Sequence, residues 1–286
     1  MSDHPDRERP SVSLALIAFL ASIGAGGFGS LVGIGGGLIL VPVLSVGLGY
    51  DVKTAIAASL IGVIATSLSA SPRYIKSGIA DRRLGLLLLV AAALGGLAGG
   101  LTAGFLDGRT LSLLFSLLLA GVALRMLWQI RHPSVPPPLD GDEGGSGFAS
   151  SYVEPTSGEV VEYQAHRIVP GTAVSFVAGN ISGLLGVGGG VINVPTMSVL
   201  MHVPIRVATT TSTYMLAATA AASATVYTVS GQVDPLLAAP VALGVIIGAR
   251  VGARLSMRLS QDMLRLAFVA VAAIFAVSMF GEFLAL

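Results

Sequence analysis

Two glycine-rich phrases contain the residues whose types and spacing are best suited to binding a ligand. They read GIGGGLILVP at residues 33–42 and GVGGGVINVP at residues 186–195. Consecutive glycines let a chain turn sharply and bring bare backbone close to a ligand. A helix that begins at such a turn has first amides without partners inside the helix, and its dipole adds partial positive charge there. The phrases therefore predict an anion site that needs no charged side chain. Its backbone residues are Gly33, Gly35, Gly36 and Gly37 in the first phrase and Gly186, Gly188, Gly189 and Gly190 in the second.

The same glycines could instead serve only the close packing of helices, which is a common use of small residues in membrane proteins. Recurrence in register, each time before a short segment that contains a proline, favours the binding role. Other glycines lie four residues apart inside long apolar segments, and we assign these to helix packing. They are Gly95, Gly99, Gly100, Gly104, Gly244, Gly248 and Gly252.

Three polar side chains could add hydrogen bonds to the predicted anion site. Ser59 and Ser212 occupy matched positions in two apolar segments that are rich in hydroxyl groups. Asn193 follows the second glycine group by one helical turn, at a depth where an unused amide would be costly. Most of the other hydroxyl groups are explained by bonds to carbonyls of their own helix.

Lys53 and Arg206 begin these two hydroxyl-rich segments, also at matched positions. We predict that they line a vestibule and draw anions towards the site. A basic residue at a membrane edge can also act only as a topology signal or as an anchor at the lipid headgroups.

Other chemistry finds no support in the residues. The chain has no cysteine, its four histidines are dispersed, and no nucleophile with a base and no Walker motif can be assembled. GAGGFG at residues 24–29 matches a dinucleotide pattern but lacks the strand and helix that such a site needs. The net charge is only +1, and the basic residues are scattered singly instead of forming a patch. Both observations argue against a nucleic-acid partner. We therefore predict no catalytic residue, no metal, no cofactor and no enzymatic activity.

The elements that must position these residues are membrane helices. Of the 286 residues 53% are hydrophobic and 11% are charged, a composition typical of a multi-pass protein of the cell membrane. Continuous apolar runs indicate helices, because a membrane span needs roughly 20 such residues. The two segments after the glycines are shorter and contain Pro42 and Pro195, which predicts half-helices or re-entrant helices. The apolar segments are 11–32, 35–49, 54–72, 84–106, 110–130, 168–185, 188–203, 207–229, 235–257 and 262–285.

The two halves of the chain align without a gap when the sequence is shifted by 153 residues. SGIAD at 77–81 then meets SGQVD at 230–234, and Lys53 meets Arg206. This register predicts a first unit at 1–131, with a short N-terminal tail, and a second at 167–286. Between them, 132–166 is an acidic linker rich in proline and glycine, which we expect to be solvated apart from a small hairpin near 152–163.

The basic residues of the short loops change sides between the halves. Arg73, Lys76, Arg82 and Arg83 surround the third connection of the first half, whereas the matching loop of the second half has no basic residue. Because basic loops mark the cytoplasmic side, the halves are predicted to be inverted repeats. The predicted fold is thus an all-α membrane protein with two inverted repeats of about five apolar segments, a cytoplasmic linker and an external C-terminus.

The paired GxGGGxxxxP phrases, each followed by a Ser/Thr-rich segment and an SGxxD turn, resemble the TauE/SafE family of sulfite exporters and related anion permeases. The resemblance covers nearly the whole chain except the N-terminal tail and the acidic linker. It implies a duplicated helical membrane fold and the export of sulfite, sulfoacetate or related sulfur-containing organic anions. Where that family usually has Gly-Thr-Ser, this chain has Ala57-Ala58-Ser59 and Thr210-Thr211-Ser212, which keeps the matched serine.

The predicted function is export of such an anion by alternating access at the interface of the repeats. Its expected partners are the small anion and the lipid bilayer, and the oligomeric state stays open. Three alternatives remain: an anion channel with the same site, a permease for a carboxylate or thiosulfate, and a membrane scaffold whose glycines serve packing alone.

Overall fold

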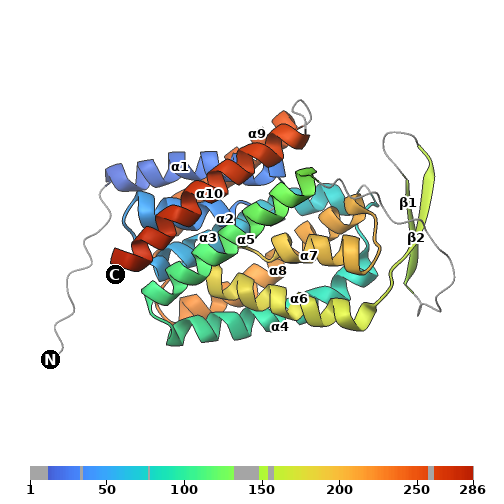
Figure 1. Ribbon diagram of the computed structural model, residues 1–286, viewed down its shortest axis with the longest axis horizontal. Coiled ribbons are helices and arrows are strands. Elements are labelled where there is room, and N and C mark those ends of the chain that lie inside the picture. Colours follow the sequence, from blue (N-terminus) through green and yellow to red (C-terminus); the bar gives the residue numbers. More distant parts are fainter. Residues whose placement is uncertain are drawn as a thin grey trace.

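The computed structural model describes residues 12–32, 35–76, 78–131, 148–153, 158–256 and 261–285. They form an elongated bundle of helices with a small hairpin at one end (Figure 1). The first half of the chain contains α1 (Val12–Val32), α2 (Gly37–Pro42), the π-helical turn η1 (Val43–Gly47), α3 (Val52–Lys76), α4 (Arg82–Phe105) and α5 (Gly108–Arg131).

The second half repeats this order after the hairpin of β1 (Ala149–Val153) and β2 (Val160–Gln164). Its helices are α6 (Ile168–Leu185), α7 (Gly190–Pro195), the π-helical turn η2 (Thr196–Leu200), α8 (Ile205–Val229), α9 (Pro235–Ser256) and α10 (Gln261–Ala285). The offset of 153 residues holds in the structure, since α2 begins at Gly37 and α7 at Gly190, and α3 begins at Val52 and α8 at Ile205. The ten predicted segments are therefore confirmed, with each short segment built from a helix and a π-helical turn.

Six of the described helices are long and apolar enough to cross a membrane: α1, α3, α4, α5, α6 and α9. Their outward faces carry large apolar side chains such as Leu16, Leu94 and Val177, each more than half exposed. Such a surface suits a lipid environment, because its side chains are apolar and the backbone hydrogen bonds lie inside each helix.

The helices pair across the two halves. Helix α1 packs along α9, and its counterpart α6 packs along α4, while α3 packs against α8 and α5 against α10. Small residues allow the close approach. A Cβ at Gly248 would lie 2.0 Å from the carbonyl oxygen of Ile23, and a Cβ at Gly99 would lie 2.0 Å from that of Asn180. The packing role predicted for Gly104 is wrong, because nothing lies within 4 Å of its Cβ position.

Matched turns lie at opposite ends of the bundle. The α3–α4 turn lies beside the hairpin, where Asp81 accepts a hydrogen bond from Tyr163. The corresponding α8–α9 turn lies at the other end, where Asp234 is close enough to Tyr50 to affect its ionisation. The described N-terminal end of α1 and the C-terminal end of α10 also lie at that end, away from the hairpin (Figure 1).

The hairpin lies within the linker, and one of its faces is buried against the helices. Strands β1 and β2 pair in antiparallel register, with Tyr152 opposite Val161 and Ser150 opposite Tyr163. Both tyrosines and Ala165 are buried and belong to an apolar cluster with Leu84 and Met197. Alternate strand residues point to one face, so the two tyrosines cover the ends of the helices. The predicted hairpin is confirmed, and residues 132–147 and 154–157 lie outside the described part.

Candidate anion site at the glycine turns

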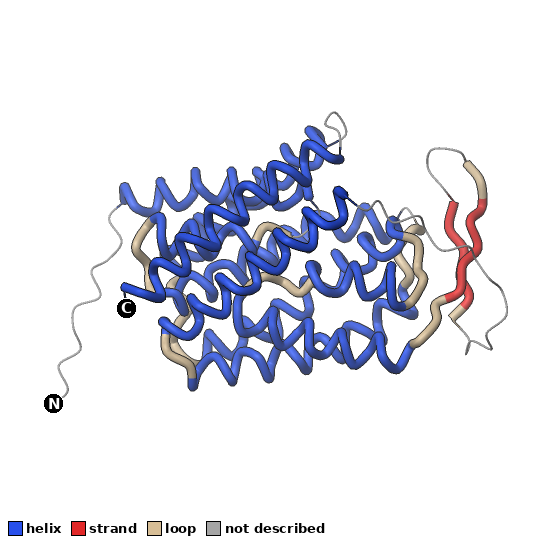
Figure 2. Tube along the Cα trace, in the orientation of Figure 1, coloured by secondary structure: helices blue, strands red, loops and turns tan. Residues whose placement is uncertain are grey.

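The two glycine turns share an unusual backbone conformation. Gly35 and Gly36 have φ values of 84° and 80°, and Gly188 and Gly189 have φ values of 83° and 70°. Other residues rarely adopt this left-handed region, because their Cβ would meet the following carbonyl group. Consecutive glycines therefore let α2 and α7 begin abruptly inside the bundle, where loop segments are visible between the helices (Figure 2). Gly33 lies outside the described residues.

The short helices continue past their prolines as π-helical turns. Pro42 ends α2 and Pro195 ends α7, and the chain stays helical to Gly47 and Leu200. Proline lacks an amide hydrogen, which removes one bond of the α-helical ladder, and a π-helical turn follows at that point in each half. Each short segment is thus an 11-residue helix that starts at a glycine turn.

The first amides of both short helices have no acceptor inside the helix. In α7 the first bond to the fourth preceding residue runs from the amide of Asn193 to the carbonyl of Gly189, at 3.0 Å. In α2 the equivalent bond runs from Leu40 to Gly36, at 3.1 Å. The amides of Ile39 and Ile192 bond to the same two carbonyls at 3.2 Å, so only the amides that precede them form a partly positive surface at the start of each helix.

The structure brings the two glycine turns together between α3 and α8. A Cβ at Gly37 would lie 2.5 Å from the carbonyl oxygen of Gly186, so the two phrases touch directly. A Cβ at Gly188 would lie 2.8 Å from Val63 of α3, and one at Gly35 would lie 3.2 Å from Leu216 of α8. Residues more than 120 positions apart therefore form one centre at the interface of the halves, here called the glycine centre.

The matched serines play different parts in this centre. Ser59 donates a hydrogen bond of 2.8 Å to the carbonyl oxygen of Gly186 and approaches that of Gly37 at 3.4 Å. Ser212 is equally buried, yet its hydroxyl has no partner. A Cβ at Gly190 would lie 3.5 Å from that hydroxyl oxygen. Ser59 therefore holds the two turns together, whereas Ser212 retains an unused hydroxyl.

Asn193 also lies at the second turn. Its side chain is 1% exposed, its Oδ1 has no hydrogen-bond partner, and its Nδ2 lies 3.5 Å from the Cβ position of Gly189. The matched residue of the first half is Leu40, which is also buried. Buried polar atoms are seldom left unpaired in folded proteins, so this amide requires an explanation beyond packing.

Lys53 and Arg206 lie at opposite ends of the bundle. The Lys53 ammonium group donates to the carbonyl oxygen of Gly104 at 3.4 Å, near the α4–α5 turn. Arg206 is exposed in the first turn of α8, which follows the segment that bonds His166 to Met201 beside the hairpin. The structure therefore separates the two predicted vestibule residues, and each lies on its own side.

Most of the hydroxyl-rich run in α8 serves its own helix. Thr209, Thr210 and Thr213 each donate to the carbonyl of the fourth preceding residue. Thr211 instead accepts a hydrogen bond of 3.0 Å from the amide of Asp81. The run thus connects α8 to the α3–α4 turn, a role that the sequence pattern did not indicate.

Asp81 is the centre of a group of hydrogen bonds at the hairpin end that involves Thr211 and Tyr163, here called the tie. One carboxylate oxygen accepts from the amide of Leu84 at 3.0 Å and caps α4, and the other accepts from the Tyr163 hydroxyl at 2.9 Å. Burial and the Asp81 carboxylate raise the pKa of Tyr163. Because Thr211 belongs to α8, the tie joins both halves and the hairpin.

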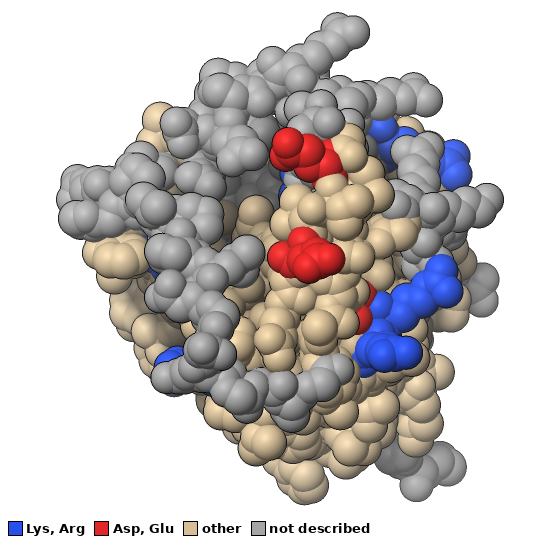
Figure 3. All heavy atoms as spheres, turned by 90° about the vertical axis from the view of Figure 1, so that its right-hand side faces the viewer, with Lys and Arg blue, Asp and Glu red and all other residues tan. Residues whose placement is uncertain are grey.

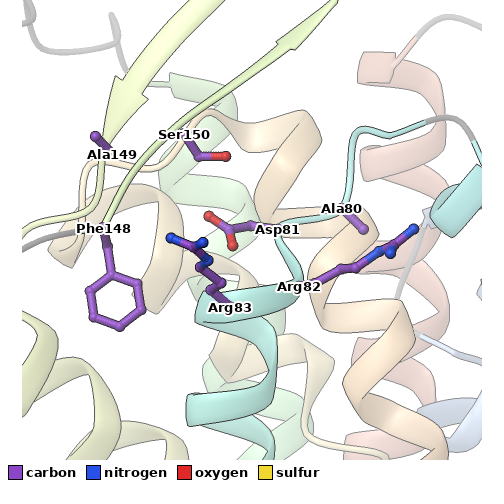
Figure 4. A pocket seen from close by; sticks show the side chains of 7 residues that line it. All are labelled: Ala80, Asp81, Arg82, Arg83, Phe148, Ala149 and Ser150. Carbon is purple, nitrogen blue, oxygen red and sulfur yellow. The ribbon is translucent and has the colours of Figure 1, made fainter.

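A pocket of about 200 Å³ lies beside this tie, between the start of α4 and the hairpin. The side chains of Asp81, Arg83 and Ser150 approach one another there, whereas Arg82 points away (Figure 4). Seen from the hairpin end, basic side chains gather towards one edge and acidic ones lie nearer the middle (Figure 3). Among the described residues, no group of three or more histidines, aspartates or glutamates could hold a metal ion.

The chain is similar over most of its length to a family of sulfite exporters and to a probable membrane transporter. Residues 18–279 match the family described as sulfite exporter TauE/SafE. The chain is also 28% identical to the probable membrane transporter protein YunE of Bacillus subtilis (strain 168). The alignment spans 240 residues, which make up 82% of this chain and 85% of that protein. No solved structure matches the chain significantly.

Proposed function

The chain belongs to the TauE/SafE family of sulfite exporters, and from this premise we propose that it exports sulfite or a small sulfur-containing organic anion such as sulfoacetate. It is a multi-pass integral membrane protein of a transporter family. The proposal adds the substrate, the binding site and the mechanism to that identity.

One observation carries the proposal: the two glycine turns meet at the interface of the halves, beside buried polar atoms that have no partner. Ser212 contributes a hydroxyl that can donate, Asn193 contributes an Oδ1 that accepts, and the free amides of α7 begin at the same turn. Amides and hydroxyl groups suit the oxygens of an oxyanion, and helix starts stabilise negative charge without a buried cation.

We infer alternating access from the relation that we propose for the halves. We propose that they are inverted repeats about an axis in the membrane plane, with the anion near that axis. The reciprocal pairs α1–α9 and α6–α4 support this relation, as does the placement of the matched turns at opposite ends. Rocking of one half against the other would then expose the site to each side in turn.

The test is sulfite efflux from proteoliposomes that contain Gly36→Leu or Gly189→Leu. Either leucine would distort a glycine turn, because Gly36 and Gly189 have the left-handed φ values of 80° and 70°, and we expect transport to fall to the level of empty vesicles. The matched control is Gly121→Leu, because nothing lies within 4 Å of that Cβ position. Recovery of each variant from the membrane in amounts equal to wild type shows that it inserts. Unimpaired efflux in both glycine-turn variants would discard the site.

Counterflow separates the transporter from an anion channel. An alternating-access transporter loaded with unlabelled sulfite takes up labelled sulfite transiently against its gradient, whereas a channel does not. Sulfoacetate, thiosulfate and small carboxylates tested as competitors in the same assay would identify the substrate class.

A further inference from the structure

Unpartnered polar atoms are concentrated in one half of the glycine centre. In α6, α7 and α8, four buried side chains have such an atom: Ser175, Ser182, Asn193 and Ser212. Elsewhere among the described residues, Tyr50, Ser112 and Glu282 also have one. At the matched positions of the first half, Ser22 bonds to the carbonyl of Ala18, Gly29 and Leu40 have no polar side chain, and Ser59 bonds to Gly186. At these four matched positions, the first half therefore has no unpartnered polar side chain.

Three of these side chains surround the turn that starts α7. The Cβ position of Gly189 lies 3.5 Å from Cβ of Ser182 and 3.5 Å from Nδ2 of Asn193, and that of Gly190 lies 3.5 Å from Oγ of Ser212. Ser182 is 0% exposed, and the other two are each 1% exposed. Two buried hydroxyl groups that can donate, and the acceptor Oδ1 of Asn193, thus lie around the turn that starts α7 and have no partner.

The site is also formally neutral. Among the described residues, Asp81 is the only charged side chain that is buried, and it is engaged in the tie at the hairpin end. No buried cation therefore balances a ligand at the α7 turn in the part of the chain that the structure describes. The desolvation cost of an ion rises with the square of its charge, so a dianion costs about four times as much to bury as a monoanion.

We propose that the second half alone provides the polar contacts to the substrate, through Ser182, Asn193, Ser212 and the first amides of α7, and that it binds a small oxyanion only in its singly charged form. This inference rests on the proposed function and deepens it. The first half provides no polar contact to the substrate. Leu40 occupies the position matched to Asn193, and Ser59 holds the two glycine turns together.

The test is ligand-induced thermal stabilisation of the purified full chain by sulfite and by methanesulfonate, below and above neutral pH. Sulfite gains its second charge near neutrality, whereas methanesulfonate stays a monoanion. We expect sulfite to stabilise wild type more strongly below neutrality and methanesulfonate to stabilise it equally at both pH values. A neutral site that binds only the singly charged form of the anion predicts this difference.

Ser182→Ala and Asn193→Leu should each weaken the apparent affinity roughly ten- to hundredfold, the range for a hydrogen bond to a charged group. Without ligand both variants should melt at or above the wild-type temperature, because each removes an unpaired buried polar atom. Ser22→Ala is the matched control, since that hydroxyl bonds only within α1. It should bind both anions as wild type does.

Wild-type affinity in both Ser182→Ala and Asn193→Leu would overturn the one-sided site, and equal stabilisation by sulfite on both sides of neutrality would overturn the charge selection. These results leave the proposed function intact as long as wild type binds the anions. If neither anion stabilises wild type at either pH, both the inference and the proposed function fail.

Discussion

At the scale of residues, the glycine centre depends on where a side chain is excluded and where it would fit. Gly37 cannot carry a Cβ, because the carbonyl oxygen of Gly186 would lie 2.5 Å away. Gly190 occupies the matched position, yet its Cβ would make ordinary contacts of 3.5 Å and 3.6 Å with Ser212 and Leu216. The second turn is therefore the one at which a small substitution can probe function without breaking the fold.

Gly190→Ala places a methyl group against the Ser212 hydroxyl, in the space that we assign to the anion. We expect anion transport to fall by at least about tenfold, equivalent to about 1.4 kcal/mol, with the melting temperature nearly unchanged. Transport assays in proteoliposomes and thermal unfolding of the same preparations test this. Gly121→Ala, in open space, is the control, and wild-type transport by Gly190→Ala would contradict the location of the site.

The Tyr163 hydroxyl makes stability depend on pH in the alkaline range. Burial and the Asp81 carboxylate raise its pKa from the ordinary value of 10.0. A raised folded pKa means that the stabilisation is fully present below pH 10.0 and is lost as pH rises through the folded value. Tyr163→Phe should cost about 1.5–3 kcal/mol at neutral pH and should flatten the alkaline decline measured by thermal unfolding. An unchanged alkaline profile would show that Tyr163 does not cause the decline.

At the scale of elements, the interfaces between the halves depend on helices that approach each other at glycines. Helix α4 meets α6 at Gly95 and Gly99, where added Cβ atoms would lie 2.0 Å from backbone oxygens. Gly104, five residues further along α4, has open space. Small residues allow such contacts because backbones can then pack directly.

Gly99→Ala and Gly104→Ala form a matched pair on this helix. The first should destabilise the protein by about 1–3 kcal/mol, because α4 and α6 must move apart. The second should leave stability unchanged or raise it by up to about 1 kcal/mol, since alanine favours helix over glycine. Denaturant unfolding in detergent compares them, and equal effects would contradict a tight interface at Gly99.

At the scale of the whole molecule, the two halves are tied at one end by the hairpin and meet in the middle at the glycine turns. The tie of Asp81, Tyr163 and Thr211 joins α4, the linker and α8. It lies at the end where α5 leads into the linker.

The proposed inversion can be tested by labelling, because the chain has no cysteine. Ser151→Cys lies in the hairpin and Ser230→Cys lies in the α8–α9 turn, and both positions are exposed. In intact cells an impermeant thiol reagent should label Ser230→Cys and should reach Ser151→Cys only after permeabilisation. Labelling of both from the same side would rule out the inverted arrangement.

Local patterns in the sequence determined the helices and the repeat. Apolar runs set the ten segments to within a few residues, and the glycines and prolines marked where the short helices begin and change, because these residues act on their own backbone. The doubled phrase also indicated a shared centre. Only the tertiary structure decided which polar side chains of that centre have hydrogen-bond partners and which do not. Ser59 bonds to Gly186, which is 127 residues away, whereas Ser212 has no partner. Identical residue types thus acquire different roles, because partners in a packed interior come from distant parts of the chain.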